Sequence, residues 1–202
     1  MKKLGRVFLA LSLMALMAGP ALAGLGVDFT GVTIDDSSGN WCLGWKFTTN
    51  SPVTITKLGF YDDLQNGLTQ NHDVGIYNAA GTLLVSTTVL PTDPLTSWFR
   101  FHDIIPLTLP GSEDFYIQGV TESENYTYNP TGFVVNPSIS FDNFAWFFPH
   151  ASVLKFPNYS DLITIGDFGP NFDTTPVPLP PALLLFGSGL LGLGGWRRFR
   201  KG

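Results

Sequence analysis

The chain from Gly24 to Pro176 consists of short apolar runs separated by Gly, Pro, Asn and Asp. None of these runs has the spacing of an amphipathic helix, whereas several alternate with the two-residue period of a half-buried strand. We therefore predict strands wherever β-branched and aromatic residues gather. The predicted strands are Leu43–Thr48, Val53–Tyr61, Asp73–Asn78, Leu83–Val89, Trp98–Ile104, Phe115–Thr121, Gly132–Val135, Ser138–Phe147 and Leu162–Ile165.

Details within these runs indicate how the strands are arranged. In Trp98–Ile104 two phenylalanines alternate with an arginine and a histidine, so one face is apolar and the other polar. Val53–Tyr61 changes phase near Lys57, which predicts a β-bulge, and Gly81 suits the positive φ of a hairpin loop. Strands spaced about ten residues apart, with no helices between them, indicate an all-β fold, an antiparallel β-sandwich of jelly-roll type.

The N-terminus has the three parts of a secretory signal peptide. Three basic residues precede an apolar run, and Ala21-Leu22-Ala23 places small residues where a signal peptidase reads them. The apolar run is short for a membrane span, which favours cleavage over the alternative of an uncleaved anchor. We expect residues 1–23 to be removed after Ala23 and the chain to be exported across the inner membrane.

The C-terminus has the length and composition of a membrane anchor. No charged residue occurs from Thr174 to Trp196, which is long enough to cross a bilayer, and a basic cluster follows. Basic residues remain on the cytoplasmic side, which leaves the body outside. We predict a β-sandwich ectodomain over residues 24–170, a linker over 171–176, a transmembrane helix over 179–196 and a basic tail over 197–201.

The predicted ectodomain is strongly acidic. All sixteen Asp and Glu of the chain fall between Gly24 and Pro176, against four Lys and Arg, a formal charge of about −12 for this part. Such a surface repels nucleic acid and anionic lipid headgroups, so neither is expected as a partner of the ectodomain. It is compatible with cations and with neutral sugars.

One polar stretch contains candidate calcium ligands. Asp62, Asp63 and Asn66 lie close together, and Asp73 follows. An EF-hand is excluded, because Leu64 occupies its third position and no helices flank the loop. The alternatives are a looser calcium site in a loop of the sandwich and a solvated turn between two strands. No other cofactor is expected.

The sequence has no catalytic signature. The three histidines lack metal-ligand spacing, no serine lies in a nucleophile elbow, and the single cysteine, Cys42, lies among apolar neighbours that predict burial. Sixteen carboxylates do not by themselves identify the acid pair of a glycosidase. Aromatic residues crowd the stretch from Phe141 to Tyr159, more than one inward face can accept, so one or two exposed rings could stack on sugars.

The last 26 residues closely resemble the PEP-CTERM sorting signal in its VPLP variant, which combines a proline-rich signature, an apolar helix and an arginine cluster. Pro181 stands where that variant usually has Ala. The resemblance implies recognition by an exosortase, a membrane transpeptidase that cuts near the proline-rich signature, and at least transient residence in the membrane. The residues that match are Val177, Pro178, Leu179, Pro180, Arg197, Arg198 and Arg200.

The body resembles uncharacterised ectodomains that often precede this signal, through G-x-x-F, L-G-F-Y-D, H-D-V-G-I-Y and G-T-L-L motifs between Leu43 and Val120. That likeness implies a β-sandwich and no known activity. We expect a non-enzymatic bacterial protein of the cell surface or extracellular matrix that binds polysaccharide, such as exopolysaccharide. The alternatives are a calcium-stabilised adhesive protein and, less favoured, a hydrolase of matrix polysaccharide.

Overall fold

The structure is a computed structural model that describes residues 24–37, 39–162 and 165–175. Within these ranges every regular element is a strand and every pairing is antiparallel, which confirms the predicted all-β fold. The same ranges contain no apolar helix of membrane-spanning length. The predicted signal peptide, with Ala23, and the whole terminal motif from Val177 to Gly202 lie outside the described residues.

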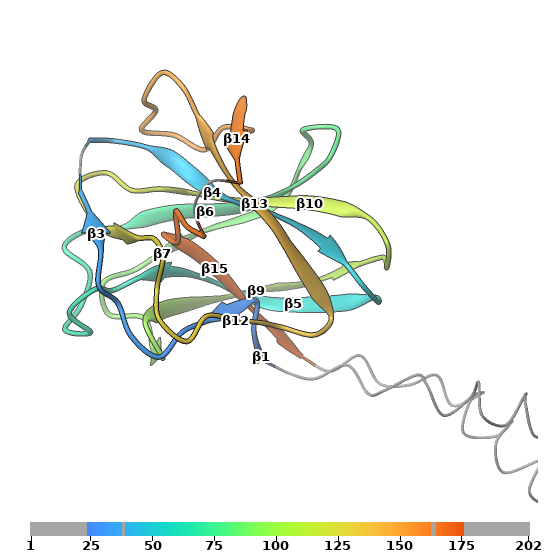
Figure 1. The fold of residues 1–202 in the computed structure, drawn as a ribbon, viewed down its shortest axis with the longest axis horizontal. Coiled ribbons are helices and arrows are strands. Elements are labelled where there is room, and N and C mark those ends of the chain that lie inside the picture. Colours follow the sequence, from blue (N-terminus) through green and yellow to red (C-terminus); the bar gives the residue numbers. More distant parts are fainter. Residues whose placement is uncertain (1–23, 38, 163–164, 176–202) are drawn as a thin grey trace, which may run out of the picture. The chain divides into compact units, whose positions relative to one another are not determined.

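Two large sheets make up most of the fold (Figure 1). The five-stranded sheet has the spatial order β1 (Gly24–Leu25), β15 (Pro170–Thr175), β5 (Val53–Tyr61), β9 (Phe99–Leu109) and β8 (Leu95–Thr96). The six-stranded sheet has the order β14 (Tyr159–Asp161), β13 (Ile139–Phe147), β4 (Cys42–Thr49), β10 (Asp114–Val120), β6 (His72–Asn78) and β7 (Leu83–Val89). Two small ladders pair β3 (Asp35–Asp36) with β11 (Tyr126–Thr127) and β2 (Val27–Asp28) with β12 (Val134–Val135).

Aromatic side chains from both sheets meet in one core. Phe172 of β15 lies with its ring centroid 5.4 Å from Trp45 and 5.0 Å from Phe47, both on β4 of the other sheet. All three are fully buried. Burying rings of this size on the two inner faces is the main source of stability for a sandwich.

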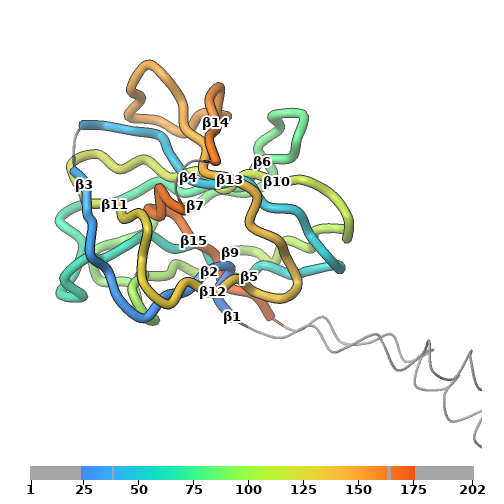
Figure 2. The backbone as a smooth tube through the Cα atoms, in the orientation of Figure 1, coloured from blue at the N-terminus to red at the C-terminus, as the bar shows by residue number. Residues whose placement is uncertain are grey.

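The predicted linker is the principal correction. Residues 171–176 were expected to join the domain to the tail, but Pro170–Thr175 forms β15, a strand hydrogen-bonded between β1 and β5. Gly24 pairs with Thr174, so the first and last described strands run side by side (Figures 1 and 2). Asn171 and Thr174 of this segment are buried together with Phe172, so the strand is part of the core.

Most other strand predictions are confirmed within a few residues. Val53–Tyr61 and Leu83–Val89 have the predicted bounds, whereas β9 continues past Ile104 to Leu109. The predicted strand Leu162–Ile165 is wrong for its two described end residues, which lie in bends, and the nearest strand is β14. The expected bulge is confirmed, because the β5–β9 register shifts between Ile55 and Lys57.

Strand pairing brings two distant loops together at one end of the fold. β10 runs antiparallel to β6, with Gly119 opposite Val74, so the end of β10 lies beside the start of β6. The loop over residues 62–71, which enters β6, therefore adjoins the loop over residues 121–125, which leaves β10. Both loops are rich in polar residues.

Candidate functional site

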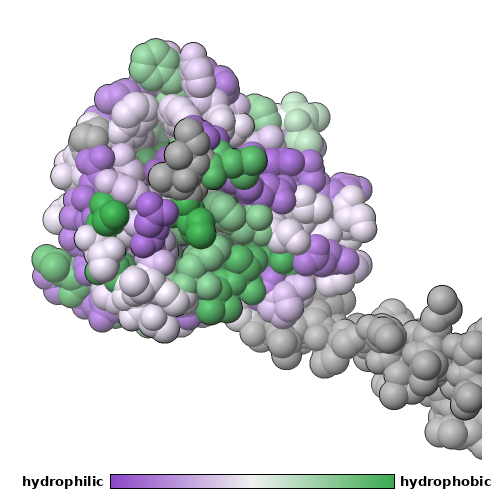
Figure 3. Space-filling view, in the orientation of Figure 1, coloured by the Kyte–Doolittle hydropathy of each residue, from purple (hydrophilic) through white to green (hydrophobic). Residues whose placement is uncertain are grey.

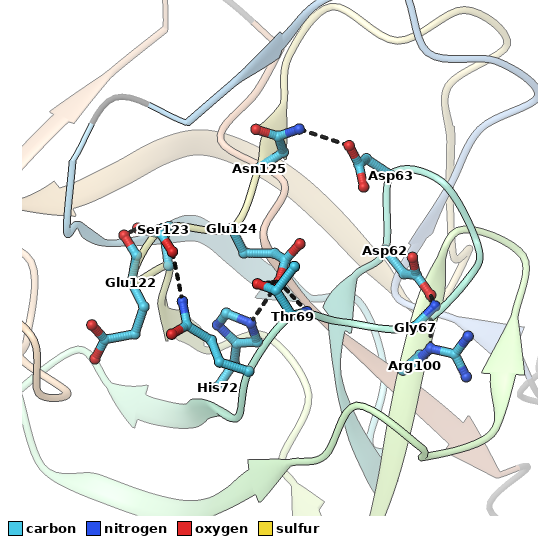
Figure 4. A network of polar contacts seen from close by, with 12 residues as sticks. Asp62, Asp63, Gly67, Thr69, His72, Arg100, Glu122, Ser123, Glu124 and Asn125 are labelled. Atoms are coloured by element: carbon cyan, nitrogen blue, oxygen red, sulfur yellow. Dashed lines mark hydrogen bonds and ion pairs between the residues drawn. The ribbon is translucent and has the colours of Figure 1, made fainter.

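Asp62 lies at the end of β5 and is almost completely buried. Its carboxylate accepts hydrogen bonds from the backbone N–H groups of Asn66 and Gly67, at 3.3 and 2.9 Å. The Nε of Arg100, on the neighbouring strand β9, lies 2.7 Å from Oδ2 of Asp62 (Figure 4). The carboxylate of Asp62 therefore holds the backbone of the loop that follows it and neutralises the guanidinium of Arg100. Both of its oxygens accept hydrogen bonds from protein donors.

The other candidate calcium ligands are directed elsewhere. Asp63 accepts a hydrogen bond of 2.7 Å from Nδ2 of Asn125 (Figure 4), and Asp73 accepts one of 2.7 Å from the hydroxyl of Thr88 on β7. Asn66 contacts Asp62 through its backbone N–H, which donates a hydrogen bond to the carboxylate. Nowhere in the described part of the chain do three His, Cys, Asp or Glu side chains form a set that could hold a metal. The four residues are therefore not brought together as one ligand set.

A second polar cluster joins the two adjoining loops. Oε2 of Glu124, in the loop after β10, accepts hydrogen bonds of 2.7 Å from both the backbone N–H and the hydroxyl of Thr69. Nε2 of His72 lies 3.4 Å from the same oxygen, close enough for an ion pair but without the geometry of a well-formed hydrogen bond. These contacts join the two loops to the first residue of β6 (Figure 4).

The buried ring of His72 is held through both nitrogens and one face. Nδ1 lies 2.9 Å from the carbonyl oxygen of Val120, and because a carbonyl can only accept, Nδ1 donates. Nε2 faces the carboxylate of Glu124. The ring also stacks on Phe60 at 4.0 Å with an interplanar angle of 9°.

The pKa of Glu124 reflects two opposing effects. Desolvation by burial raises the pKa. The hydrogen bonds and charge supplied by His72 and Thr69 lower it by a larger amount, so the pKa lies below its ordinary value. Because the side chain of His72 is fully buried and that of Glu124 is nearly so, the pair is sealed from solvent. Its role is to hold two loops together rather than to contact a ligand.

Other buried groups show no sign of nucleophilic chemistry. Cys42 is fully buried, as predicted, and desolvation raises the pKa of its thiol to about 11. Its sulfur lies 3.5 Å from the carbonyl oxygen of Lys155. Desolvation also raises the pKa of Asp167 to about 7, with a further contribution from Asp36. A protonated thiol at this depth is a packing residue.

Four partly exposed aromatic residues form a distinct surface feature, the aromatic strip, made of Phe144, Trp146, Phe148 and Tyr159. Phe144 and Trp146 are two residues apart on β13, and their rings are stacked at 5.0 Å and 16°. Tyr159 lies opposite Trp146 in the β13–β14 register and stacks on it at 5.7 Å and 18°. Phe148 meets Tyr159 edge-on at 6.0 Å.

The aromatic strip lies at the edge of the six-stranded sheet and remains partly open to solvent. Tyr159 and Phe148 are 52% and 51% exposed, and Leu162 beyond them is 73% exposed. Phe141, from the same aromatic stretch, instead packs against Trp45 in the core. Further apolar area lies near the centre of the face shown in Figure 3, where Figure 1 places β12 and β13, and Val134 of β12 is 61% exposed. Exposed apolar patches are candidate binding surfaces.

Comparison with known proteins places the domain in a family. A family model described as a domain of unknown function, DUF4082, matches residues 28–152, which is more than half of the chain. The chain belongs to the DUF4082 family. No curated protein and no solved structure matches it.

The DUF4082 match includes both polar loops and most of the aromatic strip. It ends before Tyr159 and before β15, although β15 supplies Phe172 to the core of the same fold. The residues of the sorting motif (Val177, Pro178, Leu179, Pro180, Arg197, Arg198 and Arg200) lie outside the described residues.

Sequence reasoning missed the Glu124 cluster altogether. Thr69, His72 and Glu124 have no motif spacing, and they meet only because β6 and β10 pair. The aromatic excess between Phe141 and Tyr159 was a usable signal, but the exposed rings could be named only after the register of β13 and β14 was known.

Proposed function

We propose that this DUF4082 protein is an exported bacterial protein of the cell surface or extracellular matrix whose sandwich binds polysaccharide without catalysing a reaction. The observation that carries this proposal is the aromatic strip, whose outer rings, Phe148 and Tyr159, are half exposed at a sheet edge. Binding of a neutral polymer suits the acidic body, which would repel nucleic acid and anionic membranes.

The chemistry of the aromatic strip favours sugars over other polymers. The C–H faces of a sugar ring are apolar while its hydroxyl groups remain hydrated, so sugars pack well on aromatic surfaces bordered by polar groups. Asn158, next to Tyr159, uses its side chain to bond the backbone of Phe148 at 2.8 and 2.7 Å. This pair of bonds holds the two exposed rings in place before a ligand arrives, which reduces the entropy cost of binding.

The proposal extends to a finer description of the fold, a jelly roll. Strands β1, β15, β5 and β9 in one sheet and β4, β10, β6 and β7 in the other supply its eight strands. Successive strands cross repeatedly between the sheets, with β6–β7 the only hairpin among the eight, which supports interlocked Greek keys.

The proposal also covers export and sorting. The N-terminal pattern that ends at Ala23 supports export across the inner membrane. The order of prolines, an apolar stretch and arginines after Val177 supports sorting by an exosortase-type transpeptidase, with a transient or stable hold in the membrane. The proposed location is the cell envelope or the extracellular matrix.

Retention on polysaccharide tests the binding function. The full chain, solubilised in mild detergent, would be incubated with cellulose, xylan, mannan, a mixed-linkage glucan and bacterial exopolysaccharide. We expect retention on at least one polymer, with loss of binding in Trp146→Ala and Tyr159→Leu. Tyr159→Phe, which keeps the ring, should bind like the wild type.

Two outcomes would reject the binding function. One is the absence of retention on every polymer, and the other is equal retention of the wild type and the two strip variants. Release of soluble sugar from any polymer would indicate the hydrolase alternative. The calcium-stabilised adhesive protein remains an alternative, but no observation favours it, because Asp62, Asp63 and Asp73 contact different protein donors.

A further inference from the structure

The outer edges of the two large sheets differ sharply in length. Three end in short strands: β1 and β8 have two residues each, and β14 has three. The fourth, β7, has seven residues. Among the described residues β7 pairs with β6 alone. Short edge strands are a usual protection against edge-to-edge association, and β7 lacks this protection.

The composition of β7 also leaves it open to pairing. No charged residue occurs from Val74 to Thr92, a stretch that contains all of β7. The strand has no proline and is rich in Val and Thr. The extra residue in the β6–β7 register is Leu84, since Ile76 pairs with Val85 and Tyr77 with Leu83. Val85–Val89 follows as a regular segment with no break.

The neighbouring strand β9 shows what a protected edge looks like in this protein. Its short partner β8 pairs with Phe99 and Arg100, and the backbone N–H of Phe101 bonds the carbonyl oxygen of Pro94. Among the described residues, the remainder of β9 beyond Phe101 has no strand partner on that side. That remainder contains Asp103 and Pro106, and its register with β5 is broken. A charge, a proline and an irregular register each oppose added strands. β7 carries neither the charge nor the proline.

We propose that β7 is a self-association edge, where β7 of one copy pairs antiparallel with β7 of a second copy about a two-fold axis. A two-fold contact uses the same patch on both partners, which a single strand satisfies by pairing with itself. The two six-stranded sheets would then form one continuous sheet. The unpaired backbone N–H and C=O groups of both edges would acquire partners.

Charge explains why a second copy would meet at this edge. The body carries a formal charge of about −12, so two copies repel each other over most of their surfaces. The stretch around β7 adds no charge of its own to this repulsion, and Asp73 on the adjacent strand β6 accepts a hydrogen bond from Thr88. The side chains of Ser86 and Thr88 are exposed there and those of Thr87 and Val89 are more buried, so the contact would be formed mainly by backbone.

The mass of the full chain in mild detergent, measured by sedimentation velocity over a range of concentrations, tests this inference. We expect a concentration-dependent dimer. Ser86→Lys or Ser86→Glu should raise its dissociation constant about tenfold or more, because like charges would face each other across the two-fold axis. Ser160→Lys, the matched control on edge strand β14, should leave the dimer unchanged.

Three results would overturn the proposal: a wild type that stays monomeric at every concentration, a dimer that persists in both Ser86 variants, or a dimer lost equally in Ser160→Lys. The second result would identify a contact elsewhere, including one between the C-terminal segments. Circular dichroism and the thermal midpoint of each variant separate loss of pairing from loss of folding.

Discussion

The Nε2 atom of His72 lies 3.4 Å from Oε2 of Glu124 in a site closed to solvent, and this approach connects the two loops at one end of the sandwich. The carboxylate of Glu124 is the polar group that Nε2 of His72 faces. Thr69 supplies the remaining donors to the carboxylate. The cluster therefore sets the geometry of the loops over residues 62–71 and 121–125, and its energetics can be tested directly.

Glu124→Gln should lower the free energy of unfolding at neutral pH by about 2 kcal/mol, because the two buried donors of Thr69 lose their anionic acceptor. Urea unfolding measures the change. Glu113→Gln, at an exposed position, is the matched control and should change stability by less than about 0.5 kcal/mol. Equal effects of the two substitutions would contradict the assigned role.

The Glu124 cluster should also give an acid-dependent stability. Since the pKa of Glu124 is lowered from 4.5 in the folded state, its contribution is fully present above about pH 4.5 and is lost as pH falls through the folded pKa. The stability difference between the wild type and Glu124→Gln should shrink below pH 4.5. A difference that stays constant down to pH 3 would refute the lowered pKa.

Arg100→Met should destabilise the fold by about 3 kcal/mol, because Asp62 would remain as a buried carboxylate without its cation. The matched control is Lys57→Met, since Lys57 pairs with Asp103 at 3.6 Å and the side chain of Asp103 is 85% exposed. That control should cost less than about 0.5 kcal/mol. Thermal and urea unfolding of both variants give the comparison. A small effect of Arg100→Met would show that the backbone N–H groups of Asn66 and Gly67 are sufficient to stabilise the buried carboxylate of Asp62.

Asp167→Asn should stabilise the protein above neutral pH. Burial raises the pKa of Asp167 from 3.8 to about 7, so the folded state loses stability as pH rises from about 4 to 7, while the unfolded carboxyl ionises freely. The asparagine avoids this loss and tolerates the backbone φ of 59°. We expect a gain on the order of 2 kcal/mol at pH 8 and almost none at pH 4. Asp103→Asn, the exposed control, should show no such pH-dependent gain.

Phe172→Ala should lower the free energy of unfolding by about 3–5 kcal/mol, because it removes a ring packed between Trp45 and Phe47. Thr175→Ala, an exposed change at the end of the same strand, should be close to neutral. A small effect of Phe172→Ala would restore the prediction that residues 171–176 form a linker. Differential scanning calorimetry distinguishes these outcomes.

The local sequence was sufficient for the class of fold and for most strands. In Phe99–Leu109 the apolar residues Phe99 and Phe101 alternate with Arg100 and His102, and the first pair is buried as the period of two requires. Gly81 has a φ of 81° in the loop between β6 and β7, as its position between two strands predicted. These features depend on neighbours close in sequence, so they can be read without a structure.

Only the tertiary structure decided which polar and aromatic residues act together. β15 is short and rich in Asn, Asp and Thr, and it becomes a strand because β1 and β5 pair with it on both sides. The cluster of Thr69, His72 and Glu124, the separation of Asp62 from Asp73, and the open edge at β7 all follow from strand order. Strand order is set by packing between the two sheets, a long-range property that residue spacing does not encode.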